Sequence, residues 1–326
     1  PKAELLIHQT WAYRVDDPRF APASPKPGEP ATQAAMYEQL TSAYKTIAAE
    51  LGVRRIPVGD AFHLADTDAK WGYRPDANYD FKSKEQAALP DQTHSLHAGW
   101  RRSKGADGKV SLVIDGHHAL IVVAIDNTPL RWPEYVPMNV MNALTPELAA
   151  AARGNENAPL SDAYVDFIAD ELKPYIDAHY PTRPEPAHTF IAGSSMGGLI
   201  SIYALERRPE IFSRAAGLST HWPSTTNFTL FGHSPDSADP RLGQLARQAA
   251  DTLADGLPDP DSHRLWVDYG TETLDVYYEP YAQRFEARAR QRGFGGSLVV
   301  KAFPGTAHNE ASWRKRLPEV LGFLMD

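Results

Sequence analysis

Short apolar strands alternate with segments of helical periodicity from residue 119 onward, and this alternation restricts the possible folds more than any other feature. The strand-like runs are ALIVVAID (119–126), HTFIAG (188–193), RAAGLS (214–219), LWVDYG (265–270) and SLVVKAF (297–303). Helices are expected between them: from Ser161 as N-cap, after residue 193 and ending before Pro209, over 280–292, and over 313–324. The first of these carries an apolar stripe of Tyr164, Val165, Ile168, Leu172 and Ile176. The pattern predicts an α/β fold with a mostly parallel sheet and helices on both faces.

Composition narrows the functional classes. The 326 residues suffice for one large α/β domain or two smaller ones, and 42% hydrophobic with 23% charged residues is ordinary for a soluble globular protein. A net charge of −8 favours neither nucleic acid nor an anionic membrane as partner, and no apolar run approaches the length of a membrane span. Cysteine is absent, which excludes disulfides and thiol catalysis. No signal peptide is recognisable, but a chain that starts at Pro1 is also compatible with an exported, processed protein, so the compartment stays open.

A glycine-rich turn follows the strand at 188–193 and carries the clearest chemical signal. Its sequence is Gly193-Ser194-Ser195-Met196-Gly197-Gly198, and a helix is expected to begin there. Small residues on both sides of a serine allow the sharp strand-to-helix turn that exposes a nucleophile. The N–H of Met196, at the start of that helix, is a candidate oxyanion donor. We therefore interpret Ser195 as a nucleophile, although such a turn can also serve only close packing.

A nucleophilic serine needs a general base and an acid that orients it, and in α/β-hydrolases these follow the serine in the order acid, histidine. Two carboxylates follow the strand at 265–270, Glu272 and Asp275, and Asp275 is the preferred candidate. Asp268 lies within that strand and is a candidate structural residue. The turn after the last strand contains His308, which therefore occupies the position expected for the base. A solvated loop carboxylate and a surface histidine are the alternatives.

Residues 120–326 resemble the putative-esterase family of α/β-hydrolases, which includes esterase D, enterochelin, siderophore, feruloyl and acetylxylan esterases. The resemblance rests on IVVAIDNTPLRWPEY (121–135), FIAGSSMGGLISIYAL (190–205), LSTHW (218–222), YGTETLDVYYEPY (269–281) and GTAHNEASW (305–313). It implies ester hydrolysis through an acyl-enzyme, with Ser195 as nucleophile, His308 as base and then acid, and Asp275 orienting His308. The residues it places near the cleft are Asp126, Asn127, Arg131, Trp132, Tyr135, His221 and Trp222. Arg131 is as compatible with a surface role as with binding an acidic or hydroxylated substrate group.

The segment before residue 120 departs from this family's pattern. The nearest equivalent of its oxyanion loop is Ile114-Asp115-Gly116-His117-His118, and the next strand starts almost at once. Adjacent parallel strands need a crossover of about a dozen residues or more. Strands over 110–115 and 120–125 therefore cannot be consecutive parallel neighbours; they form one bent strand, an antiparallel pair, or parts of different units. The backbone N–H of Gly116 is the preferred candidate for the second oxyanion donor, and that of His117 is the alternative.

Residues 1–119 instead resemble the C-terminal part of an SGNH-hydrolase-like family. The matching pieces are HQTWAYR (8–14), MYEQLTSAY (36–44), IPVGDAF (56–62), LPDQTHSLHAGW (89–100) and DGHHA (115–119). The resemblance implies an acid and base at Asp115 and His118, without that family's nucleophilic serine. We therefore expect two regions, an SGNH-type α/β fragment over 1–119 and an α/β-hydrolase esterase region over 120–326, joined as a fusion. A metal site made from His94, His97, Asp115, His117 and His118 is a less favoured alternative, and no metal is predicted.

The sequence as a whole predicts a serine carboxylester hydrolase without a cofactor. Its expected substrates are small acyl, carbohydrate or siderophore-type esters, and neither nucleic acid nor membrane is expected as a partner. Two alternatives stay open: a degenerate, non-catalytic fusion with an incomplete oxyanion hole, and an acyltransferase that uses an alcohol in place of water.

Overall fold

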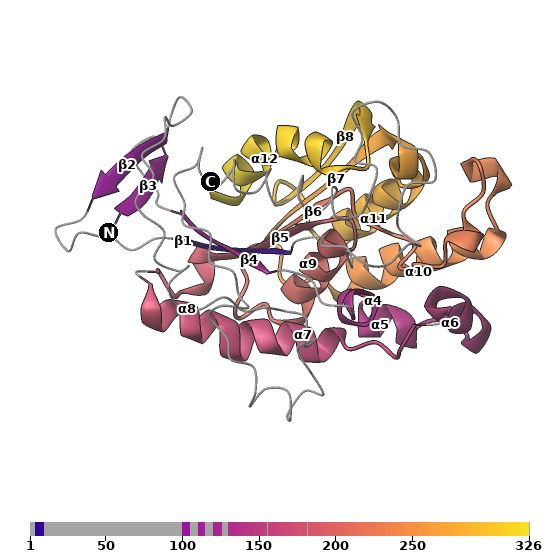
Figure 1. The fold of residues 1–326 in the computed structure, drawn as a ribbon, viewed down its shortest axis with the longest axis horizontal. Helices are drawn as coiled ribbons and strands as arrows, with labels where there is room; N and C mark the ends of the chain where they lie inside the picture. The colour runs from indigo at the N-terminus through magenta and orange to yellow at the C-terminus, as the bar shows by residue number, and fades with distance from the viewer. Residues whose placement is uncertain are drawn as a thin grey trace, which may run out of the picture. The chain divides into compact units, whose positions relative to one another are not determined.

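The computed structural model describes residues 4–9, 100–104, 110–114, 120–125, 130–154, 156–180 and 182–325 (Figure 1). The chain divides into two compact units, Pro1–Pro129 and Leu130–Asp326. The predicted division after residue 119, into an SGNH-type fragment and an esterase region, stays a prediction. No helix in the described ranges is both long enough and apolar enough to cross a lipid bilayer.

Two strand pairs make up the described part of the first unit. Strand β1 (Glu4–Gln9) runs parallel to β4 (Leu120–Ile125), with Glu4 opposite Leu120. Strand β2 (Trp100–Lys104) is antiparallel to β3 (Val110–Ile114). Strands β3 and β4 thus belong to different sheets, in agreement with the argument that too few residues separate them for a parallel crossover. The segments 36–44 and 56–62, which carry part of the SGNH-type resemblance, lie outside the described residues.

Four parallel strands form the sheet of the second unit. They are β5 (Thr189–Ser194), β6 (Arg214–Leu218), β7 (Arg264–Glu272) and β8 (Leu298–Ala307), each paired with the next. The apolar sequences of β5, β6 and β7 agree with their burial, whereas most residues of β8 are partly or fully exposed. The mostly parallel sheet that the strand–helix alternation predicts is confirmed. Because the strands are parallel, the residues that follow β5, β6, β7 and β8 gather at one edge of the sheet.

Helices cover both sides of this sheet. Figure 1 shows α7 and α9 on one side and α12 on the other, as the alternation predicts. The helices of the second unit are α4 (Arg131–Tyr135), α5 (Met138–Asn142), α6 (Pro146–Arg153), α7 (Ser161–Phe167), α8 (Lys173–His179), α9 (Met196–Arg207), α10 (Pro240–Gly256), α11 (Glu279–Gln291) and α12 (Glu310–Met325). A π-helical turn, Ile168–Leu172, joins α7 to α8.

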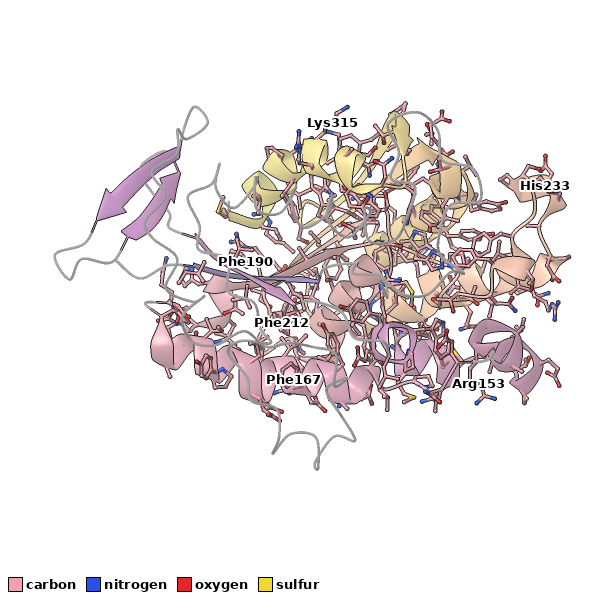
Figure 2. All side chains as sticks on the ribbon, in the orientation of Figure 1. Arg153, Phe167, Phe190, Phe212, His233 and Lys315 are labelled. Atoms are coloured by element: carbon pink, nitrogen blue, oxygen red, sulfur yellow. The ribbon has the colours of Figure 1, made fainter. Side chains whose placement is uncertain are left out.

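The core lies between the sheet and these helices. The predicted stripe of Tyr164, Val165, Ile168, Leu172 and Ile176 is buried throughout. Helix α9, which follows β5, is buried from Met196 to Leu205. Figure 2 shows Phe190 and Phe212, both fully buried, among the side chains around β5.

Three local features differ from expectation. Ser161 is the first helical residue of α7 and not its cap, because Leu160 occupies the cap position and the Ser161 hydroxyl accepts a hydrogen bond from the N–H of Met138 at 2.9 Å. Helix α12 begins three residues before the expected start at residue 313. Helix α10 has no counterpart among the predicted elements, although Asp239 caps it by accepting from the N–H of Arg241.

Candidate active site

Ser195 occupies a sharp turn between β5 and α9. Its φ of 59° and ψ of −122° lie in a region that residues with a side chain rarely adopt. Hydrogen bonds to the end of β6 and to the loop after it fix the turn. The N–H of Ser195 donates to the carbonyl of Leu218 at 2.8 Å, and the carbonyl of Ser195 accepts from the N–H of His221 at 3.1 Å. Gly198 lies in a tightly packed position, because a Cβ there would lie 3.0 Å from the Cα of Gly217.

The three predicted catalytic residues lie together at the carboxyl edge of the sheet. The Oγ of Ser195 is 2.9 Å from Nε2 of His308, and Nδ1 of His308 is 2.5 Å from Oδ1 of Asp275. Ser195 follows β5, Asp275 lies in a 3-10 turn after β7, and His308 follows β8. Asp275, and not Glu272, therefore meets the histidine; Glu272 is exposed at the end of β7.

Hydrogen-bond partners determine the tautomer of His308. Oδ1 of Asp275 can only accept, so Nδ1 of His308 carries the proton and donates to it. Nε2 of His308 therefore presents a lone pair to the hydroxyl of Ser195. Two aromatic rings hold the imidazole plane: Trp313 at 5.0 Å and Tyr278 at 5.6 Å between ring centroids, both edge-on. This arrangement suits removal of the Ser195 proton by a general base.

Asp275 is almost fully buried yet stays ionised. Burial opposes its ionisation, but hydrogen bonds from His308, from the Ser219 hydroxyl at 2.6 Å and from the Gly270 N–H at 2.5 Å outweigh it, and the pKa of Asp275 is lowered. Each of these partners donates, so the carboxylate form satisfies all of them. Gly270 has no room for a side chain, because a Cβ there would lie 2.1 Å from the carbonyl oxygen of Thr306.

Of the two predicted oxyanion donors, only Met196 belongs to the part of the chain that the structure describes. Met196 is the first residue of α9, so its N–H has no partner within the helix and lies directly after Ser195. Gly116 lies outside the described residues, and its role stays a prediction.

His221 contacts the Ser195 turn through its backbone N–H. Its ring is buried, with Nδ1 2.6 Å from the hydroxyl of Tyr278 and Nε2 2.8 Å from the carbonyl of Thr225. Nε2 therefore donates to Thr225, and Nδ1 accepts from Tyr278. Burial is the main cause that lowers the pKa of His221 to about 3, so the imidazole is neutral at physiological pH. Both nitrogens are occupied, which leaves none for a substrate.

The other residues predicted to line the cleft are distributed unevenly. Trp222 and Tyr135 are fully buried, and the Trp222 ring packs on Phe285 at 5.1 Å, as core residues do. Trp132 is buried on α4. Arg131 is half-buried, and its Nη1 is 3.5 Å from the sulfur of Met196, which brings a cation next to the nucleophile turn. Asp126 and Asn127 lie outside the described residues. The substrate contacts of the whole set stay predictions.

A further set of residues near Asp275 has no counterpart in the predicted site. Ser219 follows β6, while Trp313 and Arg316 project from α12. The indole of Trp313 donates to the Ser219 hydroxyl at 2.9 Å, and Arg316 donates to it at 3.1 Å. Ser219 directly follows an apolar strand, and residues at that position reach the carboxyl edge of a parallel sheet. This position was the sequence signal that could have indicated Ser219 as part of the site.

No cluster of three or more metal-ligating side chains occurs within the described ranges. The histidine and aspartate group at 94–118 that could form a metal site falls outside them.

The chain is similar to several known proteins and to one family model. A family model described as putative esterase matches residues 138–324, more than half of the chain. A siderophore triacetylfusarinine C esterase of Aspergillus fumigatus is 35% identical over 92 residues, which are 28% of this chain and 30% of that protein. An uncharacterized protein of Bacillus subtilis, YbbA, is 30% identical over 108 residues, covering 28% of this chain and 40% of that protein.

The chain thus spans well under two-thirds of the length of both curated relatives. Among solved structures, an IroE-like serine hydrolase from Shewanella oneidensis is 21% identical with a TM-score of 0.42, covering 64% of this chain and 60% of that one. The family match begins at residue 138, and these findings give no support to the SGNH-type resemblance of residues 1–119.

Proposed function

Because the chain belongs to the putative esterase family, we propose that it is a serine carboxylester hydrolase that acts through an acyl-enzyme. The observation that carries the proposal is the hydrogen-bonded series from Ser195 through His308 to Asp275, with distances of 2.9 Å and 2.5 Å. A serine, a histidine and an aspartate that each follow a parallel strand and are joined by hydrogen bonds fit the catalytic triad of α/β-hydrolases.

The reaction takes place in two stages. His308 Nε2 removes the proton of the Ser195 hydroxyl as its Oγ attacks the ester carbonyl, and the Met196 N–H stabilises the resulting oxyanion. His308 then gives that proton to the leaving alcohol, which leaves Ser195 acylated. Water, deprotonated by His308, attacks the acyl carbonyl, and collapse of the second tetrahedral intermediate releases the acid and restores Ser195. Asp275 stabilises the imidazolium that forms in each stage.

Small acyl esters, and esters of carbohydrates or siderophores, are the proposed substrate classes. The siderophore class is supported by the similarity to the Aspergillus siderophore esterase, and the other classes by family resemblance. The half-buried cation of Arg131 beside Met196 is compatible with an acidic or hydroxylated group on the substrate.

Two alternatives make different predictions. An acyltransferase would transfer the acyl group to an added alcohol faster than to water. A degenerate protein would keep the Ser195 geometry without turnover, because loss of an oxyanion donor reduces kcat by about 10²–10³.

The proposal is tested with a fluorophosphonate probe and with hydrolysis of p-nitrophenyl acetate. We expect the label on the peptide that contains Ser195, and loss of both label and turnover in Ser195→Ala. Ser297→Ala is the matched control, because Ser297 precedes β8 at the opposite end of that strand from His308. A folded wild-type protein with neither label nor turnover would reject the esterase proposal. Faster product formation with added alcohol would favour acyl transfer.

A further inference from the structure

The side chain of Ser219 is placed to control the second oxygen of Asp275. Oδ1 of Asp275 accepts from His308, while Oδ2 accepts from the Ser219 hydroxyl at 2.6 Å and from the Gly270 N–H. Ser219 itself is fully buried, at a φ of 45° in the turn after β6. No other hydroxyl among the hydrogen bonds of the described residues reaches this carboxylate.

The direction in which Ser219 donates is fixed by its other partners. The indole N–H of Trp313 and the guanidinium of Arg316 both point at its oxygen, at 2.9 Å and 3.1 Å. Neither group can accept a hydrogen bond. The one proton of the Ser219 hydroxyl therefore has Asp275 as its acceptor, and the hydroxyl cannot rotate to another partner.

Arg316 is in turn held by a buried ion pair. Its Nη1 is 2.6 Å from Oδ1 of Asp268, and Arg316 is only 2% exposed. Asp268 also accepts from the Trp266 indole at 2.9 Å and from the Ser219 N–H at 3.0 Å. The ion pair therefore fixes both the backbone and the hydroxyl oxygen of Ser219.

We propose that Ser219, oriented by Arg316 and Trp313, is a positioning residue for Asp275 in the proposed esterase reaction. With Oδ2 bound by Ser219 and Gly270, the carboxylate presents Oδ1 to His308 and stays ionised as the imidazolium forms. Ser219 touches neither substrate nor the reacting atoms, so its effect passes through Asp275. The inference rests on the proposed function.

A double-mutant cycle separates this role from a structural one. Kinetics with p-nitrophenyl acetate are measured for the wild type, Ser219→Ala, Asp275→Ala and the double variant. Because a hydrogen bond to a charged group is lost, Ser219→Ala is expected to lower kcat about tenfold or more with little change in KM. In the Asp275→Ala background the same substitution is expected to change kcat less than about twofold, since its target is gone. Equal reductions in both backgrounds would overturn the proposal.

The chain offers a matched control at the other end of the same strand. Ser213 precedes β6, is buried, and its hydroxyl has no hydrogen-bond partner among the described residues. Ser213→Ala is therefore expected to keep the wild-type kcat. Ser219→Gly is the second variant, because glycine accepts the φ of 45° and removes the hydroxyl with less risk to folding. If neither Ser219 variant folds, Ser219 serves the fold and the positioning role is rejected.

A measurement without substrate distinguishes failure of this inference from failure of the esterase proposal. The short His308–Asp275 hydrogen bond should give a downfield proton resonance that is absent in His308→Ala. Under the positioning proposal this resonance moves or broadens in Ser219→Ala and is unchanged in Ser213→Ala. An unchanged resonance in Ser219→Ala rejects the positioning role even in a protein that hydrolyses esters. Absence of turnover in the wild type bears on the esterase proposal alone.

Discussion

All three hydrogen-bond partners of Asp275 donate to its carboxylate, so replacing it with asparagine, which also carries an NH₂ donor, is an informative test. In Asp275→Asn, the Ser219 hydroxyl and the Gly270 N–H both require the amide oxygen, so the amide NH₂ faces His308. Nδ1 of His308 must then accept, and the ring proton moves to Nε2, where it faces Ser195. We expect kcat to fall by about 10⁴ with little change in KM, as measured by steady-state ester hydrolysis.

Glu272 provides the control for that substitution. It lies on the same segment but is exposed, so Glu272→Gln should leave kcat within about twofold of the wild type. A larger loss in Glu272→Gln than in Asp275→Asn would assign the acid role to Glu272.

Gly270 shows how closely β7 and β8 approach each other beside the triad. A Cβ at this position would lie 2.1 Å from the Thr306 carbonyl and 2.7 Å from Oδ2 of Asp275. Gly270→Ala is therefore expected to destabilise the fold by about 1–3 kcal/mol and to reduce kcat, as measured by chemical denaturation and ester hydrolysis. A Cβ at position 296 would have no atom within 4 Å, so Gly296→Ala should change neither the stability nor kcat. A fully active and stable Gly270→Ala protein would contradict the geometry of this strand pair.

At the scale of elements, a buried carboxylate lies where α5, α9 and α10 meet. Glu206 of α9 accepts from Asn139 of α5 at 2.6 Å, and its side chain fills the space beside Gly256 of α10. Burial raises the pKa of Glu206 from 4.5 to about 8, against opposing contributions from Asn139 and Arg292. The folded state therefore binds a proton that the unfolded state releases between these two pH values.

This linkage has a definite sign. Because the folded pKa is raised, the contribution of Glu206 to stability is lost as pH rises from about 4.5 to 8. Glu206→Gln, which mimics the protonated form, should be stabilised relative to the wild type at pH 8, by about 1.4 kcal/mol for each unit of pKa shift, and should match it at pH 4.5. Unfolding free energies measured across this range test the prediction. A stability difference between the wild type and Glu206→Gln that stays the same from pH 4.5 to 8 would contradict the raised pKa of Glu206.

At the scale of the whole molecule, the two units differ in their expected part in chemistry. Ser195, His308 and Asp275 all belong to Leu130–Asp326, whereas Asp115 and His118 of the predicted SGNH-type block precede it. We expect His118→Ala to keep both fluorophosphonate labelling of Ser195 and ester turnover, in contrast to Ser195→Ala. Loss of turnover in a folded His118→Ala protein would mean that the first unit takes part in catalysis.

Much of the second unit was predictable because its signals are local and repeated. Strands such as 214–219 are continuous apolar runs bounded by polar residues, and the stripe from Tyr164 to Ile176 has clear helical spacing. The relative order of Ser195, Asp275 and His308 along the chain then predicted which residues would meet, since the strands that carry them are parallel. The sequence signals of helix α10 are equally local, because Asp239-Pro240 stands at its start. Apolar residues then recur at helical spacing, at Leu242, Leu245, Ala249 and Leu253. The helix was nevertheless not predicted.

The features that could not be predicted depend on contacts between distant segments. Ser219 and Arg316 are 97 residues apart, and nothing in either segment shows that they meet at Asp275. Trp222 and Tyr135 are residue types that often line ligand-binding surfaces, but tertiary packing buries both side chains completely. Residue type indicates what a side chain can bind, whereas burial decides whether a substrate can reach it.

The backbone of Ser195 has a practical consequence for protein engineering. At a φ of 59° and ψ of −122°, any side chain is strained by about 1–3 kcal/mol, and glycine is not. A laboratory evolution experiment that rewards only yield or heat resistance would therefore enrich glycine at position 195 and eliminate the proposed nucleophile in a single step. Libraries of this chain need a turnover screen alongside the stability screen.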